Sequence, residues 1–116
     1  MSESTTIAVT TEGNSTLSKL VNSKYFKEQQ DAAKFAAAYA IKLGVEPSAV
    51  KGGTTKWNIG SFDSDGKFRE LIKLSIPDQD KDSIKIAEGL IQEGLILLNR
   101  KLEDAGGIFS LEDIIA

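Results

Sequence analysis

Apolar and small polar residues alternate at the start of the chain. Within residues 5–11, Ile7 and Val9 lie on one side of an extended chain, and Thr6, Ala8 and Thr10 lie on the other. This period of two is typical of a β-strand that buries one face and exposes the other. We therefore expect a strand here.

A short helix is expected next. Residues 12–15 read as the turn before it, and Asn14 or Ser15 can accept a hydrogen bond from an exposed N–H of its first turn. Its apolar side follows a spacing of three and four residues and consists of Leu17, Leu20 and Val21. The helix should end near residues 23–24.

The second expected helix begins near residues 27–30, ends before Gly44 and is apolar around most of its circumference. One stripe consists of Ala32, Phe35, Ala36, Tyr39 and Leu43. A shallower face consists of Ala33, Ala37, Ala38 and Ile41. Gly44 fits the left-handed position after such a helix. We do not expect one small chain to bury all these positions, so the pattern predicts an intertwined homodimer; the alternative is an alanine-rich core helix inside one chain.

Beyond residue 50 the pattern predicts another strand and a helix. Residues 55–59 alternate, with Trp57 and Ile59 on one side, as in a strand, which could lie at a sheet edge. A helix is expected over 67–75, before Pro77. Its inward-facing residues are expected to be Phe68, Leu71, Ile72 and Leu74.

The longest expected helix covers residues 82–104. Its apolar stripe consists of Ile84, Ala87, Ile91, Leu95, Leu98 and Leu102. Gly89 and Gly94 each weaken a helix by about 1 kcal/mol relative to alanine, so we expect them to allow close packing against another helix. A last short helix, with its capping box at Ser110–Asp113, is expected to dock through its apolar residues.

These elements predict a mostly α protein with short β-strands, of the α+β class. We expect a strand-helix-helix unit over residues 1–50. Residues 51–116 should form a β-strand and a helical extension that docks on the same core. The chain of 116 residues has room for one compact domain.

The amino-acid composition excludes several kinds of catalytic and metal-binding site. The chain has no cysteine and no histidine, so disulfides, the usual zinc sites and Ser-His or Cys-His nucleophile pairs are excluded. No catalytic residue, metal ligand or cofactor site is expected, and we predict that the chain is not an enzyme. No apolar stretch is long enough to span a membrane and no secretory signal is visible, so a cytoplasmic location is expected.

The charge balance argues against a strongly basic nucleic-acid binder. The net charge is −3, whereas phosphate contacts by lysine and arginine supply most non-specific affinity for DNA. Residues 1–50 carry five basic and five acidic side chains, and residues 51–116 carry nine basic and twelve acidic ones. The acidic surplus therefore lies in the second half.

A possible calcium loop and a single tryptophan each have a structural and a functional interpretation. The sequence Asp63-Ser64-Asp65-Gly66 resembles part of a calcium loop, but Ser61 and Ile72 occupy the positions of the first and last ligands. A turn that starts a helix is the better interpretation. Trp57 is suited to stack on a base, although a single tryptophan on an alternating strand is more often a core anchor.

The first forty-four residues resemble a known family. The segments Ile7-Ala8-Val9, Leu17–Val21, Tyr25-Phe26 and Asp31–Gly44 are together similar to ribbon-helix-helix DNA-binding regulators over residues 4–44. The stretch from Phe26 to Gly44, with Trp57-Asn58-Ile59 and Phe68–Ile72, is also similar to small proteins found with DNA phosphorothioation and related phage-defence systems.

The first resemblance implies a dimer whose two N-terminal strands pair and enter the major groove of double-stranded DNA. The base-facing residues would be Thr6, Ala8 and Thr10. The residues that position the DNA backbone would be Lys24, Lys27 and Gln30, around the start of the second helix. Two threonines and an alanine depart from the Arg, Lys, Asn or Gln that family ribbons usually carry.

Two functions are therefore expected as alternatives. The first is a homodimeric DNA-binding protein that acts in transcription regulation or as an accessory factor. The second is a protein-interaction subunit of a DNA-modification or phage-defence assembly, which uses its C-terminal helices to hold a partner and does not read DNA.

Overall fold

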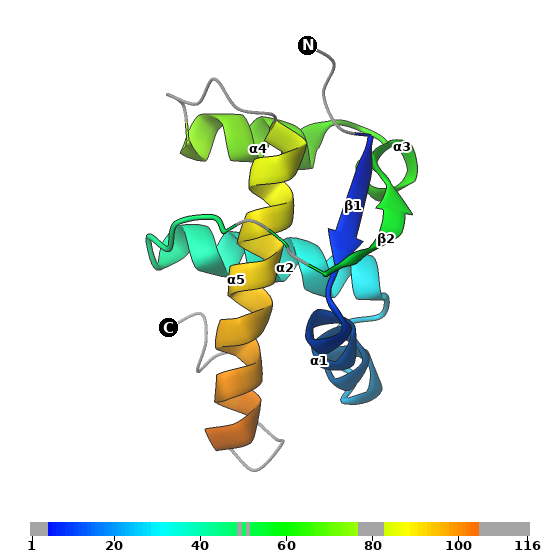
Figure 1. The fold of residues 1–116 in the computed structure, drawn as a ribbon, viewed down its shortest axis with the longest axis vertical. Helices are drawn as coiled ribbons and strands as arrows, with labels where there is room; N and C mark the ends of the chain where they lie inside the picture. Colours follow the sequence, from blue (N-terminus) through cyan, green and yellow to red (C-terminus); the bar gives the residue numbers. More distant parts are fainter. Residues whose placement is uncertain (1–4, 49, 51, 77–82, 105–116) are drawn as a thin grey trace.

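The computed structural model describes residues 5–48, 50, 52–76 and 83–104 (Figure 1). A two-stranded sheet is combined with five helices in this part of the chain. The elements in chain order are β1 (Thr6–Val9), α1 (Thr11–Asn22), α2 (Gln29–Lys42), β2 (Thr54–Asn58), α3 (Ile59–Phe62), α4 (Lys67–Ser75) and α5 (Ser83–Asp104). The predicted mostly α fold with short strands is confirmed at this level.

The two predicted strands pair with each other. β1 is antiparallel to β2, with Ile7 opposite Trp57 and Ala8 opposite Thr55, and the register shifts between these pairs. Lys56 is left without a direct partner, which marks a β-bulge. Ile7 is fully buried and Val9 is 2% exposed, so the predicted inward face of the first strand is confirmed.

Helix α1 begins earlier than predicted. The expected turn at residues 12–15 is wrong, because the helix starts at Thr11 and Thr10 is its N-cap. The Thr10 hydroxyl accepts a hydrogen bond from the Gly13 amide at 3.0 Å, so Asn14 and Ser15 lie inside the helix. The expected end near residue 23 is confirmed.

Helix α2 is largely buried within a single chain. It crosses behind α5 in Figure 1 and packs mainly against that helix. The fully buried alanines of α2 are Ala32, Ala33, Ala36, Ala37 and Ala40. One chain therefore covers much of this helix but not all of it, because Ala38 and Leu43 are exposed, and the homodimer stays a prediction. Leu43 was expected to face inward, but it is 51% exposed at the end of the helix.

The end of α2 was predicted correctly. Gly44 has φ +70°, and the Val45 amide donates to the Ala40 carbonyl at 3.0 Å. This is the bond that closes a helix through a left-handed glycine, followed by an apolar residue that packs back on the core.

Two glycines of α5 allow the chain to pack closely. A Cβ atom at Gly94 would overlap the carbonyl of Ala36 on α2, and one at Gly89 would overlap the backbone of Ser48. Close packing against another helix was expected at both glycines; it is confirmed at Gly94, whereas Gly89 packs against the loop that follows α2. The predicted apolar stripe of α5 is also confirmed, because all six of its residues are buried.

Helix α4 starts at a buried carboxylate. Asp63 is 2% exposed and accepts hydrogen bonds from the amides of Phe68 and Arg69, both at 3.0 Å. The Arg69 guanidinium adds an ion pair at 2.9 Å. The helix-start interpretation of residues 63–66 is confirmed, and Gly66, with φ +74°, supplies the left-handed turn before the helix.

Opposing effects act on the pKa of Asp63. Burial raises it, but the hydrogen bonds from the amides of Arg69 and Phe68 and the nearby guanidinium lower it, and the net effect is a pKa below the ordinary 3.8. A lowered folded-state pKa contributes stability above pH 3.8 that is lost as the pH falls through the lowered value.

Asp63→Asn is expected to lower the free energy of unfolding by about 2 kcal/mol at neutral pH, because an amide cannot replace a charged acceptor of three hydrogen bonds. The difference from the wild type should shrink in strong acid, where the wild-type carboxyl is protonated. Urea denaturation over a pH series measures both effects. Asp65→Asn, at an exposed neighbour, is the matched control, and a pH-independent difference would contradict this assignment.

The described residues form one core. β1 from the first half pairs with β2 from the second, and α2 packs on α5, so a boundary at residue 50 does not separate two interiors. The last expected helix, with its capping box at Ser110–Asp113, lies outside the described residues.

Candidate functional site

The outer face of the sheet carries two of the predicted DNA-contacting residues. Thr6 lies opposite Asn58, and Ala8 lies opposite Thr55, so these four residues share the face away from the core. Thr6 and Ala8 are half-buried, whereas Thr55 and Asn58 are exposed. This face offers hydroxyl and amide groups and no charge.

Thr10 does not join this face. Its side chain is inside the molecule, with a 7% exposed fraction. Its hydroxyl caps α1 at Gly13 and also donates to Oε1 of Gln92 on α5 at 3.3 Å. In this conformation Thr10 has a structural role and cannot contact a base.

Thr10→Ala is expected to lower the free energy of unfolding by about 1 kcal/mol, the usual effect of removing an N-cap hydroxyl. Thermal or urea unfolding measures it. Thr55→Ala, on the exposed sheet face, should change stability little. Equal stability of the two variants would show that the cap has no effect.

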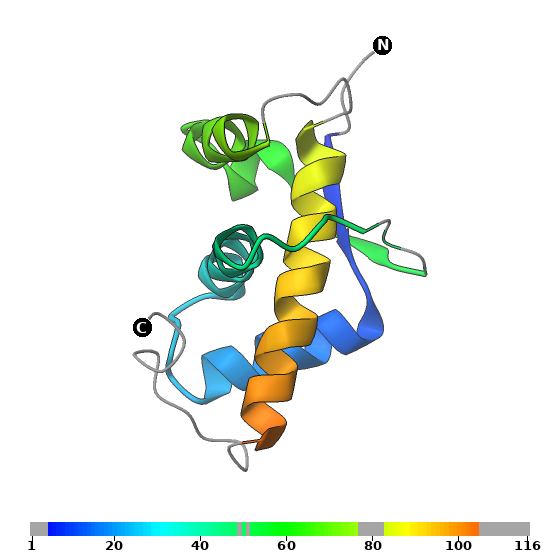
Figure 2. The same ribbon diagram turned by 90° about the vertical axis from the view of Figure 1, so that its left-hand side faces the viewer.

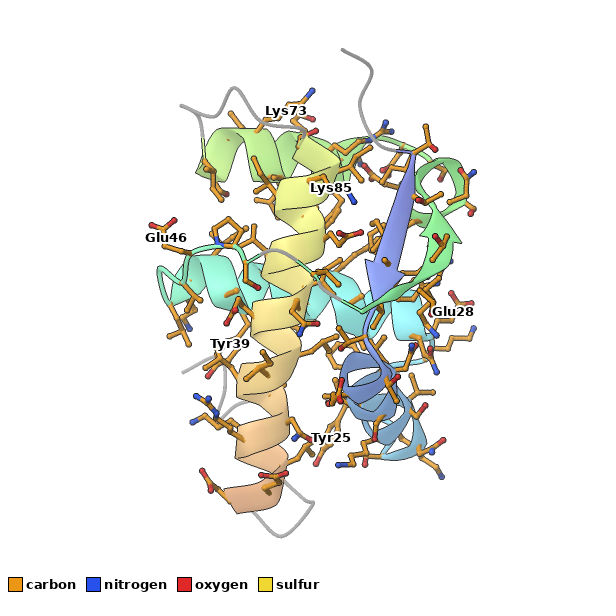
Figure 3. The ribbon with its side chains drawn as sticks, in the orientation of Figure 1. Tyr25, Glu28, Tyr39, Glu46, Lys73 and Lys85 are labelled. Atoms are coloured by element: carbon orange, nitrogen blue, oxygen red, sulfur yellow. The ribbon has the colours of Figure 1, made fainter. Side chains whose placement is uncertain are left out.

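The outer edge of β1 is closed by α5. The Ala8 amide points away from β2 and donates to Oε2 of Glu88 at 2.8 Å. Lys85 lies 3.4 Å from the other carboxylate oxygen of Glu88, and Figure 3 shows its side chain extending from α5 toward β1. A second copy of β1 could pair along this edge only if the bond to Glu88 were broken. Pairing of two β1 strands stays a prediction, but this conformation does not offer a free ribbon.

The predicted backbone-contacting residues lie elsewhere. Lys24 and Lys27 are exposed in the connection between α1 and α2, and Gln30 is half-buried in the first turn of α2. Lys24 has φ +65°. Figure 2 shows this connection and the sheet on opposite sides of α5. The buried Thr10 lies on neither surface, and the other five predicted residues are split between two surfaces of the chain.

Sequence reasoning missed an apolar surface on α4. Leu71 and Leu74 were expected to face inward, which is wrong: their exposed fractions are 42% and 73%. Only Phe68 and Ile72 of this helix are buried. The spacing contained the signal, because residues 68, 72 and 76 form one stripe at intervals of four and the two leucines fall beside it.

Charged residues surround the two leucines. We call this surface the α4 leucine face, defined by Lys67, Glu70, Leu71, Lys73 and Leu74, all of them exposed. Its three charged side chains sum to +1. Figure 3 shows Lys73 pointing away from the rest of the chain. The arrangement suits an apolar segment that carries acidic groups at its border.

Aromatic rings and lysines gather at the end of the sheet. The ring centroids of Trp57 and Phe62 are 5.0 Å apart. Nζ of Lys56 lies 5.4 Å from the Trp57 ring, and Nζ of Lys34 lies 5.1 Å from the Phe62 ring. Trp57 is half-buried, so it serves as a core anchor with part of its surface exposed.

A shallow groove runs between α1 and α5. Its volume is about 300 Å³. The lining residues are Glu12, Gly13, Thr16, Gln92, Leu95, Ile96, Asn99, Arg100 and Glu103. Two carboxylates and one guanidinium give this groove a net negative lining.

The chain matches no protein-family model, no curated protein and no solved structure. Its function is therefore inferred from its own residues. Across residues 5–48, 50, 52–76 and 83–104, no three acidic side chains cluster closely enough to hold a metal ion. No helix in these ranges is both long and apolar enough to cross a bilayer.

Proposed function

We propose that the chain is a non-catalytic protein-interaction subunit and that the α4 leucine face is its docking surface. The observation that carries this proposal is the exposure of Leu71 and Leu74, at 42% and 73%, on a helix whose other apolar residues are packed in the core. Exposed apolar surface bordered by charge is characteristic of sites where proteins bind one another.

The charges around the leucines indicate the chemistry of the partner. Lys67 and Lys73 outnumber Glu70, so an amphipathic helix with acidic residues beside its apolar stripe would be attracted electrostatically as well as buried. The resemblance of residues 26–44 to proteins of DNA phosphorothioation and phage-defence systems makes such an assembly the setting we propose.

A fluorescent probe beside Leu74 tests the docking surface. The chain has no cysteine, so Glu70→Cys carries a single polarity-sensitive dye. Two synthetic peptides serve as ligands, an amphipathic leucine-glutamate helix and the same helix with lysine in place of glutamate. We expect the acidic peptide to shift the emission to the blue and the basic peptide to leave it unchanged.

The control is the same dye at Ser15→Cys, an exposed position of α1, which should respond to neither peptide. The added change Leu74→Ser should abolish the response at position 70. Equal responses to both peptides, or a response that survives Leu74→Ser, would reject the α4 leucine face as a docking surface.

Binding of double-stranded DNA is a second candidate function. It is supported by Lys34 and Lys56, whose ammonium groups lie against the rings of Phe62 and Trp57. Trp57 is the sole tryptophan of the chain, so its fluorescence reports directly on this place. Quenching by DNA that weakens steeply as salt rises would support this function, and unchanged fluorescence at low salt would reject it.

A further inference from the structure

We propose that the partner of the α4 leucine face is a second copy of the same chain, bound through residues 110–116. This inference rests on the proposed function and names the segment that the surface would hold. It is carried by three features of the chain: the chemistry of that segment, the length of α5 compared with the reach of residues 105–110, and the charge of the alternative groove.

The sequence of residues 108–116 has the required chemistry. Leu111, Ile114 and Ile115 are spaced three and four residues apart, which would place them on one side of a helix. Glu112 and Asp113 would border that side. An apolar stripe with two acids is therefore available for the leucines and lysines of α4.

The same chain is poorly placed to supply this segment to its own α4. Helix α5 has 22 residues, which corresponds to about 33 Å. Figure 1 places α4 beside the first turns of α5, at the end opposite to Asp104. Residues 105–110 span at most about 21 Å when fully extended. A helix that begins after residue 110 would meet the α4 leucine face of its own chain only with residues 105–110 fully extended along α5, so a second copy is the occupant that we propose.

The groove between α1 and α5 is closer to the end of α5, but its charge does not suit this segment. Glu12 and Glu103 line it together with Arg100, which gives a net charge of −1 against the two acids of residues 112–113. The α4 leucine face, with +1, attracts the same acids. Exchange of segments between two copies would close a symmetric dimer in which both α4 surfaces are covered.

Light-scattering mass of the full-length chain tests this inference. We expect the wild type to approach the mass of two chains as its concentration is raised, because association follows mass action. Leu74→Glu and the double change Leu111→Ser with Ile114→Ser should each reduce it to the mass of one chain. Leu43→Glu is the matched control, because Leu43 is an exposed leucine on α2 and should leave the dimer intact.

Charge reversal provides a second test that does not depend on the apolar changes. Lys67→Glu with Lys73→Glu, and separately Glu112→Lys with Asp113→Lys, should each weaken association at least tenfold. Mixing these two variants should restore association, because the reversed surface of one then meets the reversed segment of the other. A merely structural effect of either pair would not be restored by mixing.

A wild-type mass of one chain at all concentrations would overturn the inference. A two-chain mass that resists the changes at 111 and 114 would overturn it as well. The proposed function would survive both results if the dye at position 70 still responded to the acidic peptide. If that response were absent, the proposed function would fail whatever mass the wild type had.

Discussion

Gly94→Ala is expected to lower the free energy of unfolding by about 3 kcal/mol, at the upper end of the usual cost of overpacking. On an exposed helix this substitution would instead stabilise by about 1 kcal/mol. In this chain the substitution destabilises instead, because the added methyl group would overlap the Ala36 carbonyl. A backbone carbonyl cannot swing aside as a flexible side chain can, so α2 and α5 must separate to accommodate the methyl group.

Urea denaturation measures this effect. Lys101→Ala, at an exposed position of the same helix, should change stability by less than about 0.5 kcal/mol. A Gly94→Ala variant as stable as the wild type would mean that α2 does not cross α5 at Ala36.

Glu88→Ala is the second change with a large expected effect, a loss of about 2 to 3 kcal/mol. Glu88 is 4% exposed, and its carboxylate accepts from the Ala8 amide at 2.8 Å. Removing it leaves that amide without its acceptor and leaves a cavity between α5 and β1. The outer edge of β1 would also be uncovered, so we expect this variant to aggregate more readily.

Glu88→Gln separates the hydrogen bond from the charge. The amide oxygen of glutamine can still accept from Ala8, and only the ion pair with the largely exposed Lys85 is lost. We expect a loss of about 1 kcal/mol or less for this variant. If glutamine and alanine destabilised the chain equally, the contact with the Ala8 amide would not be the source of the effect.

Local periodicity in the sequence predicted several elements well. The bounds of α4 agree with the expected 67–75, and the stripe of α5 is buried as expected. The turn at residues 63–66 was also correct, because a carboxylate before a helix has a local physical role that needs no distant partner. Regular spacing and capping residues are local signals, and they fix an element before its neighbours are known.

The sequence did not identify correctly which of several candidate residues caps a helix, or which leucines face the core. Thr10, Asn14 and Ser15 are all suitable N-caps, and the preference for the later two was wrong because Gly13 fits inside the helix against Val9 and Leu95. Leu71 and Leu74 were assigned to the core from their hydrophobicity alone. The structure shows that Phe68 and Ile72 already fill the contact of α4 with the core.

The partners of α2 and β1 could not be predicted from local pattern. A helix that is apolar on several sides needs to be covered, but its sequence does not say whether the cover is α5 or a second copy. A strand likewise does not encode whether it pairs with β2 or with itself. The candidate site follows from these choices, because closure of both elements within one chain leaves α4 as the helix with two exposed leucines.

Cysteine pairing across the sheet tests most directly whether one chain closes its own fold. Ala8 and Thr55 are directly opposite on the outer sheet face, where facing Cβ atoms lie about 5 Å apart, and the chain contains no other cysteine. The combined variant Ala8→Cys with Thr55→Cys should, on mild oxidation of a dilute sample, form a disulfide within one chain. A disulfide between two chains, formed equally well by Ala8→Cys alone, would show instead that β1 pairs with its copy.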